Sequence, residues 1–195
     1  EVGGTVEDQG DAFGDLGTLL ILIVILVYIV MATQFESLKF PFIIMFTIPF
    51  AFTGVFLALW MTSTPLSLIA LIGAIMLVGI VTKNGIVMVD YMNLLIERGS
   101  GVFDAVIAGG KSRLRPVLMT SFTTILGMLP LAIGTGAGSE TWQPMGIAVI
   151  GGLTFSTILT LFIVPVLYSI LVNRSQRKER EKLARLSAEH QASKH

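Results

Sequence analysis

Residues 66–95 read LSLIALIGAIMLVGIVTKNGIVMVDYMNLL, a long apolar segment with one lysine, Lys83, near its middle. A helix rises about 1.5 Å per residue, so Lys83 would lie roughly 25 Å from Leu66 and about 18 Å from Leu95. A lysine side chain does not readily carry its ammonium that far. A charge at the centre of a bilayer costs about 2.5–3.5 kcal/mol on insertion scales. Lys83 must therefore be paired, hydrated or neutral, and it indicates a functional site.

The composition is that of a membrane protein. Of the 195 residues, 53% are hydrophobic and 13% are charged, whereas soluble domains carry about 25% charged residues. The net charge is zero, and we expect no nucleic-acid partner. There is no cysteine, the only histidines are His190 and His195, and neither HExxH nor GxSxG occurs. We therefore expect a protein that is not an enzyme and has no catalytic residue, cofactor or metal site.

Apolar segments predict an all-α membrane protein with five transmembrane helices, because a spanning helix needs about 20 mostly apolar residues. We expect Pro49 and Pro165 to kink two of these helices and Pro116 to lie in the first turn of another. Residues 96–112 mix charges with an apolar patch, which predicts a short amphipathic helix along the interface. The predicted spans are residues 17–32, 42–61, 66–95, 117–133 and 145–172.

The two ends of the chain carry different charges. Residues 1–16 hold five acidic side chains, no Lys or Arg, and several glycines, and we expect them to form a solvated lead-in that follows a further domain. Residues 173–195 form a charged tail. In the predicted topology, twelve of the thirteen Lys and Arg residues fall on one side, and Lys83 is the remaining one. The positive-inside rule then places the N-terminus outside and the C-terminus in the cytoplasm, which requires an odd number of spans.

Lys83 has two interpretations. It could merely fit its helix to a water-filled crevice or a lipid defect, or it could belong to a proton or ion relay, because a desolvated ammonium responds to a neighbouring carboxylate. Asn84 beside it can donate and accept hydrogen bonds. Asp90 returns to roughly the same face two turns later, which is too far for direct contact. No other carboxylate lies inside a predicted span, so the counter-charge must come from outside this chain.

A second group of polar residues surrounds the start of the fourth span. Arginines just before a span are usually topology anchors, and we favour this role for Arg115. Arg113 comes seven residues before Thr120, so the two share a face if the helix begins early. Hydroxyls at the start of this span either join helices, at about 0.6 kcal/mol per bond, or line a water path to Lys83. These hydroxyls belong to Thr120, Ser121, Thr123 and Thr124.

Several runs resemble the resistance-nodulation-division (RND) efflux permeases of the hydrophobe/amphiphile type. They are QFESLKFPFIIMFTIPFA (34–51), LIGAIMLVGIVTKNGIVMVDY (71–91), RLRPVLMTSFTTILGMLPLAIGTGAGSE (113–140) and the last span with Val164 and Pro165. Together they cover most of residues 10–172, in family order. In that family this portion corresponds to the last five of twelve membrane helices and follows a large periplasmic domain.

The resemblance implies drug/proton antiport by a homotrimer in the bacterial inner membrane, which engages a periplasmic adaptor and an outer-membrane channel. It also implies a periplasmic N-terminus for this portion. Lys83 matches a lysine that pairs with two aspartates in the N-terminal half of the permease, which is therefore an expected partner. Arg113 and Thr120 match members of the same proton relay, and Asn84 is a further candidate.

The same runs also bear on the branch of the family, and one alternative function remains. The FES…PF match (35–42) and the RLRP match (113–116) favour the efflux branch, and metal exporters are less similar in the first link, residues 33–40. The alternative is a non-transporting membrane scaffold, or a superfamily relative that handles lipids or secreted proteins, in which Lys83 is only structural.

Overall fold

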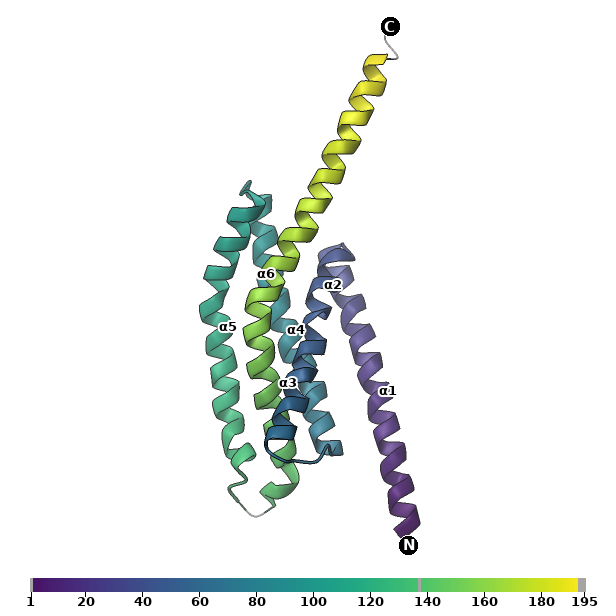
Figure 1. The fold of residues 1–195 in the computed structure, drawn as a ribbon, viewed down its shortest axis with the longest axis vertical. Coiled ribbons are helices and arrows are strands. Elements are labelled where there is room, and N and C mark those ends of the chain that lie inside the picture. The colour runs from purple at the N-terminus through teal and green to yellow at the C-terminus, as the bar shows by residue number, and fades with distance from the viewer. Residues whose placement is uncertain (1, 137, 193–195) are drawn as a thin grey trace.

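The computed structural model describes the backbone of residues 2–136 and 138–192 and the side chains of residues 8–136 and 138–174. The described backbone forms helices and contains no strand, which confirms the predicted all-α class. Residues 175–195, which include most of the predicted tail and both histidines, lie outside the described side chains. The helices are α1 (Val2–Phe35), α2 (Lys39–Met45), α3 (Thr47–Met61), α4 (Leu68–Glu97), α5 (Val102–Ile133) and α6 (Ser139–Ala192) (Figure 1).

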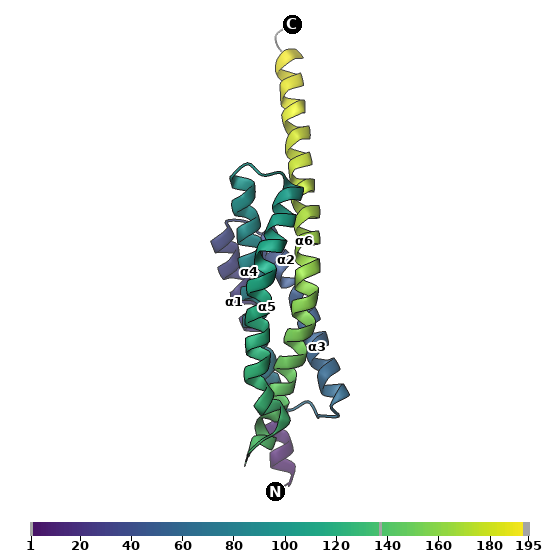
Figure 2. The same cartoon turned by 90° about the vertical axis from the view of Figure 1, so that its left-hand side faces the viewer.

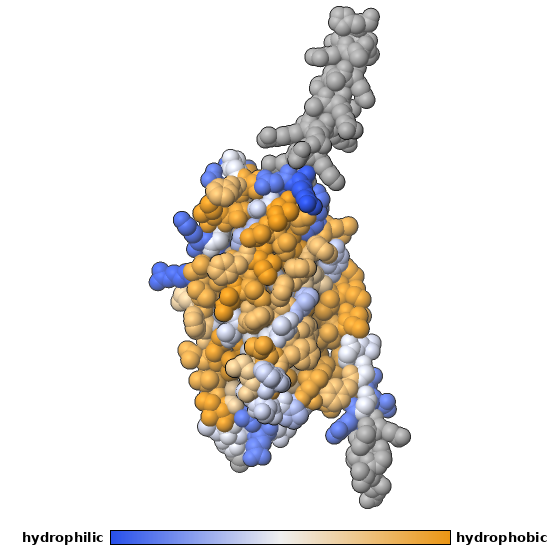
Figure 3. All heavy atoms as spheres, viewed as in Figure 1, coloured by the Kyte–Doolittle hydropathy of each residue, from blue (hydrophilic) through white to orange (hydrophobic). Residues whose placement is uncertain are grey.

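Five stretches within the described part of the chain are long and apolar enough to cross a membrane, as predicted. Apolar side chains cover most of the middle of the face in Figure 3, and hydrophilic residues gather mainly at its two ends. The molecule is therefore a multi-pass membrane protein in its composition and helix lengths. The five stretches are Asp8–Phe35, Lys39–Met61, Leu68–Glu97, Val102–Ile133 and Ser139–Arg174.

Helix α6 is the centre of the bundle. It packs against α3, α4 and α5, whereas α1 contacts only α2 and α4 among the described elements. Successive spans run in opposite directions, so that the two ends of the chain lie at opposite ends of the bundle (Figures 1 and 2). The bundle places α4 between α1 and α5, with both of these helices in contact with it.

The core lies along the line where α6 meets α3 and α4. Glycines let these helices approach closely, as expected for membrane packing. A Cβ added at Gly152 of α6 would lie only 2.1 Å from the Leu77 side chain of α4, and one at Gly54 would lie 2.8 Å from the Gly151 carbonyl oxygen. The largest fully buried side chains include Tyr168, Met31, Ile43, Ile44, Leu77, Met88 and Met92.

Residues 2–16, which were expected to form a solvated lead-in, are helical, because α1 begins at Val2. A glycine costs about 1 kcal/mol in a helix interior. Nucleating a helix is unfavourable, but once the apolar segment has formed a helix, each further residue adds a hydrogen bond. Nothing lies within 4 Å of a Cβ added at Gly10, Gly14 or Gly17, so close packing does not require glycine at these positions. The acidic side chains of Asp8, Asp11 and Asp15 are exposed, in agreement with a solvated segment.

The second predicted span is interrupted near its proline, as expected. Helix α2 ends at Met45, Phe46 forms a turn, and α3 begins at Thr47, two residues before Pro49. Proline removes one backbone donor, and its ring clashes with the carbonyl four residues earlier, which here belongs to Met45. The helix therefore breaks at the residue that Pro49 disturbs.

The separate interfacial helix predicted for residues 96–112 is also wrong. A short turn follows α4, and then α5 runs without interruption from Val102 to Ile133, so that Pro116 lies well inside it and not in a first turn. Membrane helices tolerate an internal proline when neighbouring groups satisfy the freed carbonyl. Helix α5 ends at Gly134, whose φ of 75° is the left-handed conformation that glycine accepts without strain. Helix α6 similarly continues through Pro165, which does not end it.

Candidate functional site

Lys83 lies near the midpoint of α4, about 22 Å from either end of this 30-residue helix. The helix begins at a regular cap, where the Ser67 hydroxyl accepts a hydrogen bond from the Ala70 backbone at 3.2 Å. No ion pair or hydrogen bond involves the Lys83 ammonium in residues 8–136 and 138–174. The five spans therefore leave this charge without a partner in their own described side chains.

The Lys83 side chain belongs to a row of exposed residues that follows the whole of α4. Their spacings of three, four and seven residues put them on one side of a helix. We call this row the open stripe. The side chains on its flanks are packed, since Thr82 is 4% exposed and Asn84 is 9% exposed. The open stripe consists of Ile72, Met76, Gly79, Lys83, Asp90, Leu94 and Glu97.

The side chains of Asn84 and Lys83 lie on different sides of α4. Adjacent helical residues point about 100° apart, and Asn84 is buried while Lys83 is exposed. Asn84 therefore lies on the packed side of α4, and the structure does not bring its amide together with the ammonium in a hydrogen bond within the described side chains.

Arg113 and Thr120 lie in one continuous helix, α5, which satisfies the condition under which they were expected to share a face. The Thr120 hydroxyl donates to the backbone oxygens of Pro116 at 3.2 Å and Val117 at 3.0 Å. The Arg113 Cζ lies 4.6 Å from the centroid of the Tyr91 ring of α4. No hydrogen bond or ion pair joins Lys83, Arg113 and Thr120 to one another within the described residues.

The relative placement of α4 and α5 brings the candidate residues to neighbouring levels. The two helices run antiparallel and are joined by a short turn (Figure 1). Tyr91 and Arg113 face each other. Moving seven residues away from the turn along each helix leads to Asn84 on α4 and Thr120 on α5. Thr120 therefore lies at about the height of Lys83, and Arg113 lies about two turns nearer to the connecting turn.

The other hydroxyls of α5 have separate roles. Ser121 is buried and forms a hydrogen bond of 2.9 Å with Thr157 of α6, which is the packing role considered from the sequence. Thr123 donates to the Met119 oxygen at 2.8 Å, and Thr124 donates to the Thr120 oxygen at 2.9 Å. Only Ser121 among these hydroxyls joins two helices in the described part of the chain.

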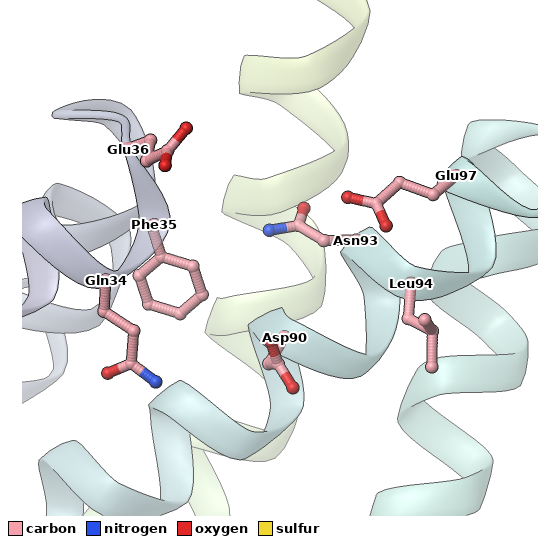
Figure 4. Close-up of a pocket in the computed structure, with 7 residues that line it drawn as sticks. All are labelled: Gln34, Phe35, Glu36, Asp90, Asn93, Leu94 and Glu97. Carbon is pink, nitrogen blue, oxygen red and sulfur yellow. The ribbon is translucent and has the colours of Figure 1, made fainter.

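Asp90 lines a polar cavity that sequence reasoning missed. The cavity has a volume of about 300 Å³ and lies between the end of α1 and the last turns of α4 (Figure 4). Beside it, the Tyr168 hydroxyl of α6 donates to the Asn93 side chain. No three His, Cys, Asp or Glu side chains are placed to share a metal ion in residues 8–136 and 138–174. The cavity is lined by Gln34, Phe35, Glu36, Asp90, Asn93, Leu94 and Glu97.

Local sequence patterns could not reveal this cavity or the contact between Tyr91 and Arg113. Both depend on how separate helices approach each other. The only available signal was the short link at residues 98–101, because Tyr91 and Arg113 lie at equal distances in sequence from Val102. A tight helical hairpin brings such residues to the same level.

An all-helical bundle with five apolar spans and a lysine in the middle of one span defines a multi-pass membrane protein with an intramembrane charge. The family profile described as the AcrB/AcrD/AcrF family matches residues 1–172. The chain belongs to this family of RND permeases, which confirms the resemblance drawn from the sequence.

Individual relatives carry names from two branches of the family. The chain is 39% identical to the cobalt-zinc-cadmium resistance protein CzcA of Cupriavidus metallidurans over 91% of its length and 17% of the relative. It is 42% identical to the multidrug resistance protein MdtC of Erwinia tasmaniensis over 83% of its length and 16% of that protein. A crystal structure of a heavy metal efflux pump matches with a TM-score of 0.78 and 32% identity, over 86% of this chain and 17% of that one. The chain thus spans about a sixth of the length of these relatives.

These similarities do not separate drug export from metal export. The identities to the metal-resistance and multidrug relatives are close, and the matching solved structure is that of a heavy metal pump. The preference for the hydrophobe/amphiphile branch therefore remains a prediction.

Proposed function

We propose that this chain is the C-terminal membrane portion of a proton-driven RND efflux permease, and that Lys83 carries part of its proton relay. The observation that carries the proposal is the position of Lys83 on the open stripe. A charged side chain at the centre of an apolar span is expensive. Among the described residues, no side chain forms an ion pair or hydrogen bond with the Lys83 ammonium.

The missing compensation is best supplied by carboxylates from an N-terminal portion that packs over the open stripe. An opposite charge within about 4–6 Å stabilises an ammonium. Protonation of those carboxylates would weaken the ion pair and free Lys83, and a change in helix packing would follow. Arg113 and Thr120 are included because α5 holds them beside α4, with Thr120 at the height of Lys83.

The remaining parts of the proposal concern the whole protein. We place it in the bacterial inner membrane with the start of α1 in the periplasm and the C-terminus in the cytoplasm, since the basic residues of the links gather at one end. We propose a homotrimer that works with a periplasmic adaptor and an outer-membrane channel. For the substrate we propose drugs and other amphiphiles, on the basis of the run at residues 34–51.

The test is Lys83→Ala in the complete permease, with Lys111→Ala as the control for loss of an exposed lysine of the neighbouring helix. We expect Lys83→Ala to abolish export and substrate-dependent proton flux in proteoliposomes, while membrane insertion and assembly stay normal. Lys111→Ala should retain both activities. Full export by Lys83→Ala would refute the relay and favour a structural role.

The substrate is tested separately. Cells with the complete permease should export amphiphilic dyes and survive cytotoxic drugs better than cells without it. If they instead gain resistance only to zinc, cobalt or cadmium, the protein belongs with the metal exporters, and the relay proposal is unaffected.

A further inference from the structure

The contact between Tyr91 and Arg113 is the one described interaction that holds a cation of the proposed relay. The guanidinium carbon lies 4.6 Å from the ring centroid, within the roughly 6 Å over which a cation is attracted to an aromatic face. The Arg113 Nε is buried and has no hydrogen-bond partner among the described atoms. In that part of the chain, no carboxylate forms an ion pair with this arginine.

An aromatic ring differs from a carboxylate as a partner for this charge. A carboxylate would neutralise the guanidinium and hold it in a bidentate pair. The ring attracts the cation through its quadrupole and leaves the net positive charge in place. Arg113 is therefore held at a defined position but stays able to bind an anion that approaches from outside the five spans.

The position of the ring connects this contact to Lys83. Tyr91 directly follows Asp90 of the open stripe and lies about 12 Å along the axis of α4 from Lys83. The ring is on α4 and the guanidinium is on α5, so the contact also sets the level of one helix against the other. Without the ring, the flexible Arg113 side chain would have no described polar or aromatic group to define its position.

We infer that Tyr91 is a positioning residue, whose ring holds the Arg113 guanidinium beside α4 when the carboxylates of the rest of the permease are protonated. When those carboxylates become charged, they compete with the ring for the guanidinium. This inference depends on the proposed function, because it assigns Tyr91 a role through Arg113. It concerns a residue other than those expected from the family resemblance.

The experiment weakens the attraction of the ring for the guanidinium in steps and leaves the shape of the ring nearly unchanged. Position 91 of the complete permease is replaced by phenylalanine and by phenylalanines with one, two and three ring fluorines, which progressively weaken the negative face of the ring. The readout is the initial rate of substrate-dependent proton flux in proteoliposomes. The same series at Phe122, an exposed ring on α5 with no described cation contact, is the control.

We expect Tyr91→Phe to retain the flux and the rate to fall stepwise with each fluorine. Tyr91→Leu should lower it roughly tenfold. The Phe122 series should stay flat. Equal rates across the series at position 91 would overturn the inference, and this readout does not depend on whether Tyr91→Leu folds.

Lys83→Ala separates the two proposals. If Lys83→Ala is inactive and the fluorine series is flat, only the inference about Tyr91 fails, whereas an active Lys83→Ala removes the relay itself.

Discussion

The two sides of α4 differ in what they touch. The packed side brings Leu77 and Gly85 against α6 and α2, with almost no accessible surface. The open stripe carries Lys83 and Asp90 along the same helix, exposed and without ion-pair partners in the described residues. Packing within these five spans thus explains one side only. The other side carries polar groups that no described contact within these spans explains.

The largest expected effect on folding concerns the packed side. Tyr168 is fully buried, its hydroxyl donates to Asn93 of α4, and its ring stacks on Phe40 with centroids 5.6 Å apart. Tyr168→Ala should cost about 3–5 kcal/mol, the range for removing a large buried aromatic ring. Thermal unfolding of the purified permease in detergent measures the loss. Leu94→Ala on the open stripe, whose side chain is 37% exposed, should lower the unfolding temperature much less, and a similar loss at both positions would contradict the division between the two sides.

Two glycines of α4 provide a smaller and more closely matched test. A Cβ at Gly85 would lie 2.8 Å from Cγ2 of Ile44, whereas nothing lies within 4 Å of one at Gly79 on the open stripe. Gly85→Ala should destabilise the permease by about 1–3 kcal/mol, as overpacking does. Gly79→Ala should be neutral or slightly stabilising, since alanine is the better helix former. The unfolding temperatures of the two variants should therefore move apart. A larger loss for Gly79→Ala would mean that the rest of the permease packs tightly over the stripe at that position.

The sequence was sufficient to predict the spans and the intramembrane lysine because both depend on local composition. About 20 apolar residues need no tertiary context to indicate a membrane helix, and Lys83 was conspicuous within such a segment. The helix ends were predicted less well. Residues 2–16 and 102–116 contain glycines, charges or a proline, yet they continue the helices that the apolar segments begin.

The arrangement of the candidate site could not be predicted in the same way. The apolar residues of α4 occur on all sides, so periodicity did not distinguish the stripe with Lys83 from the packed side with Asn84. The ring of Tyr91 came to Arg113 only through the register of two antiparallel helices. Expectations about the counter-charge remain predictions, because they concern residues outside this chain.

The smallest expected effect tests whether α5 has the same division between a packed and an open side. Ser121 and Thr157 are 4% and 5% exposed and share a hydrogen bond of 2.9 Å between α5 and α6. Such interhelical bonds in membranes contribute about 0.6 kcal/mol on average. A double-mutant cycle with Ser121→Ala and Thr157→Val should give a coupling of about that size. Thr123→Ala is the control, because its hydroxyl is exposed and donates within its own helix to Met119. Coupling near zero for Ser121 with Thr157, or equal coupling for Thr123 with Thr157, would contradict this division of α5 into a packed and an open side. The division would then be a property of α4 alone.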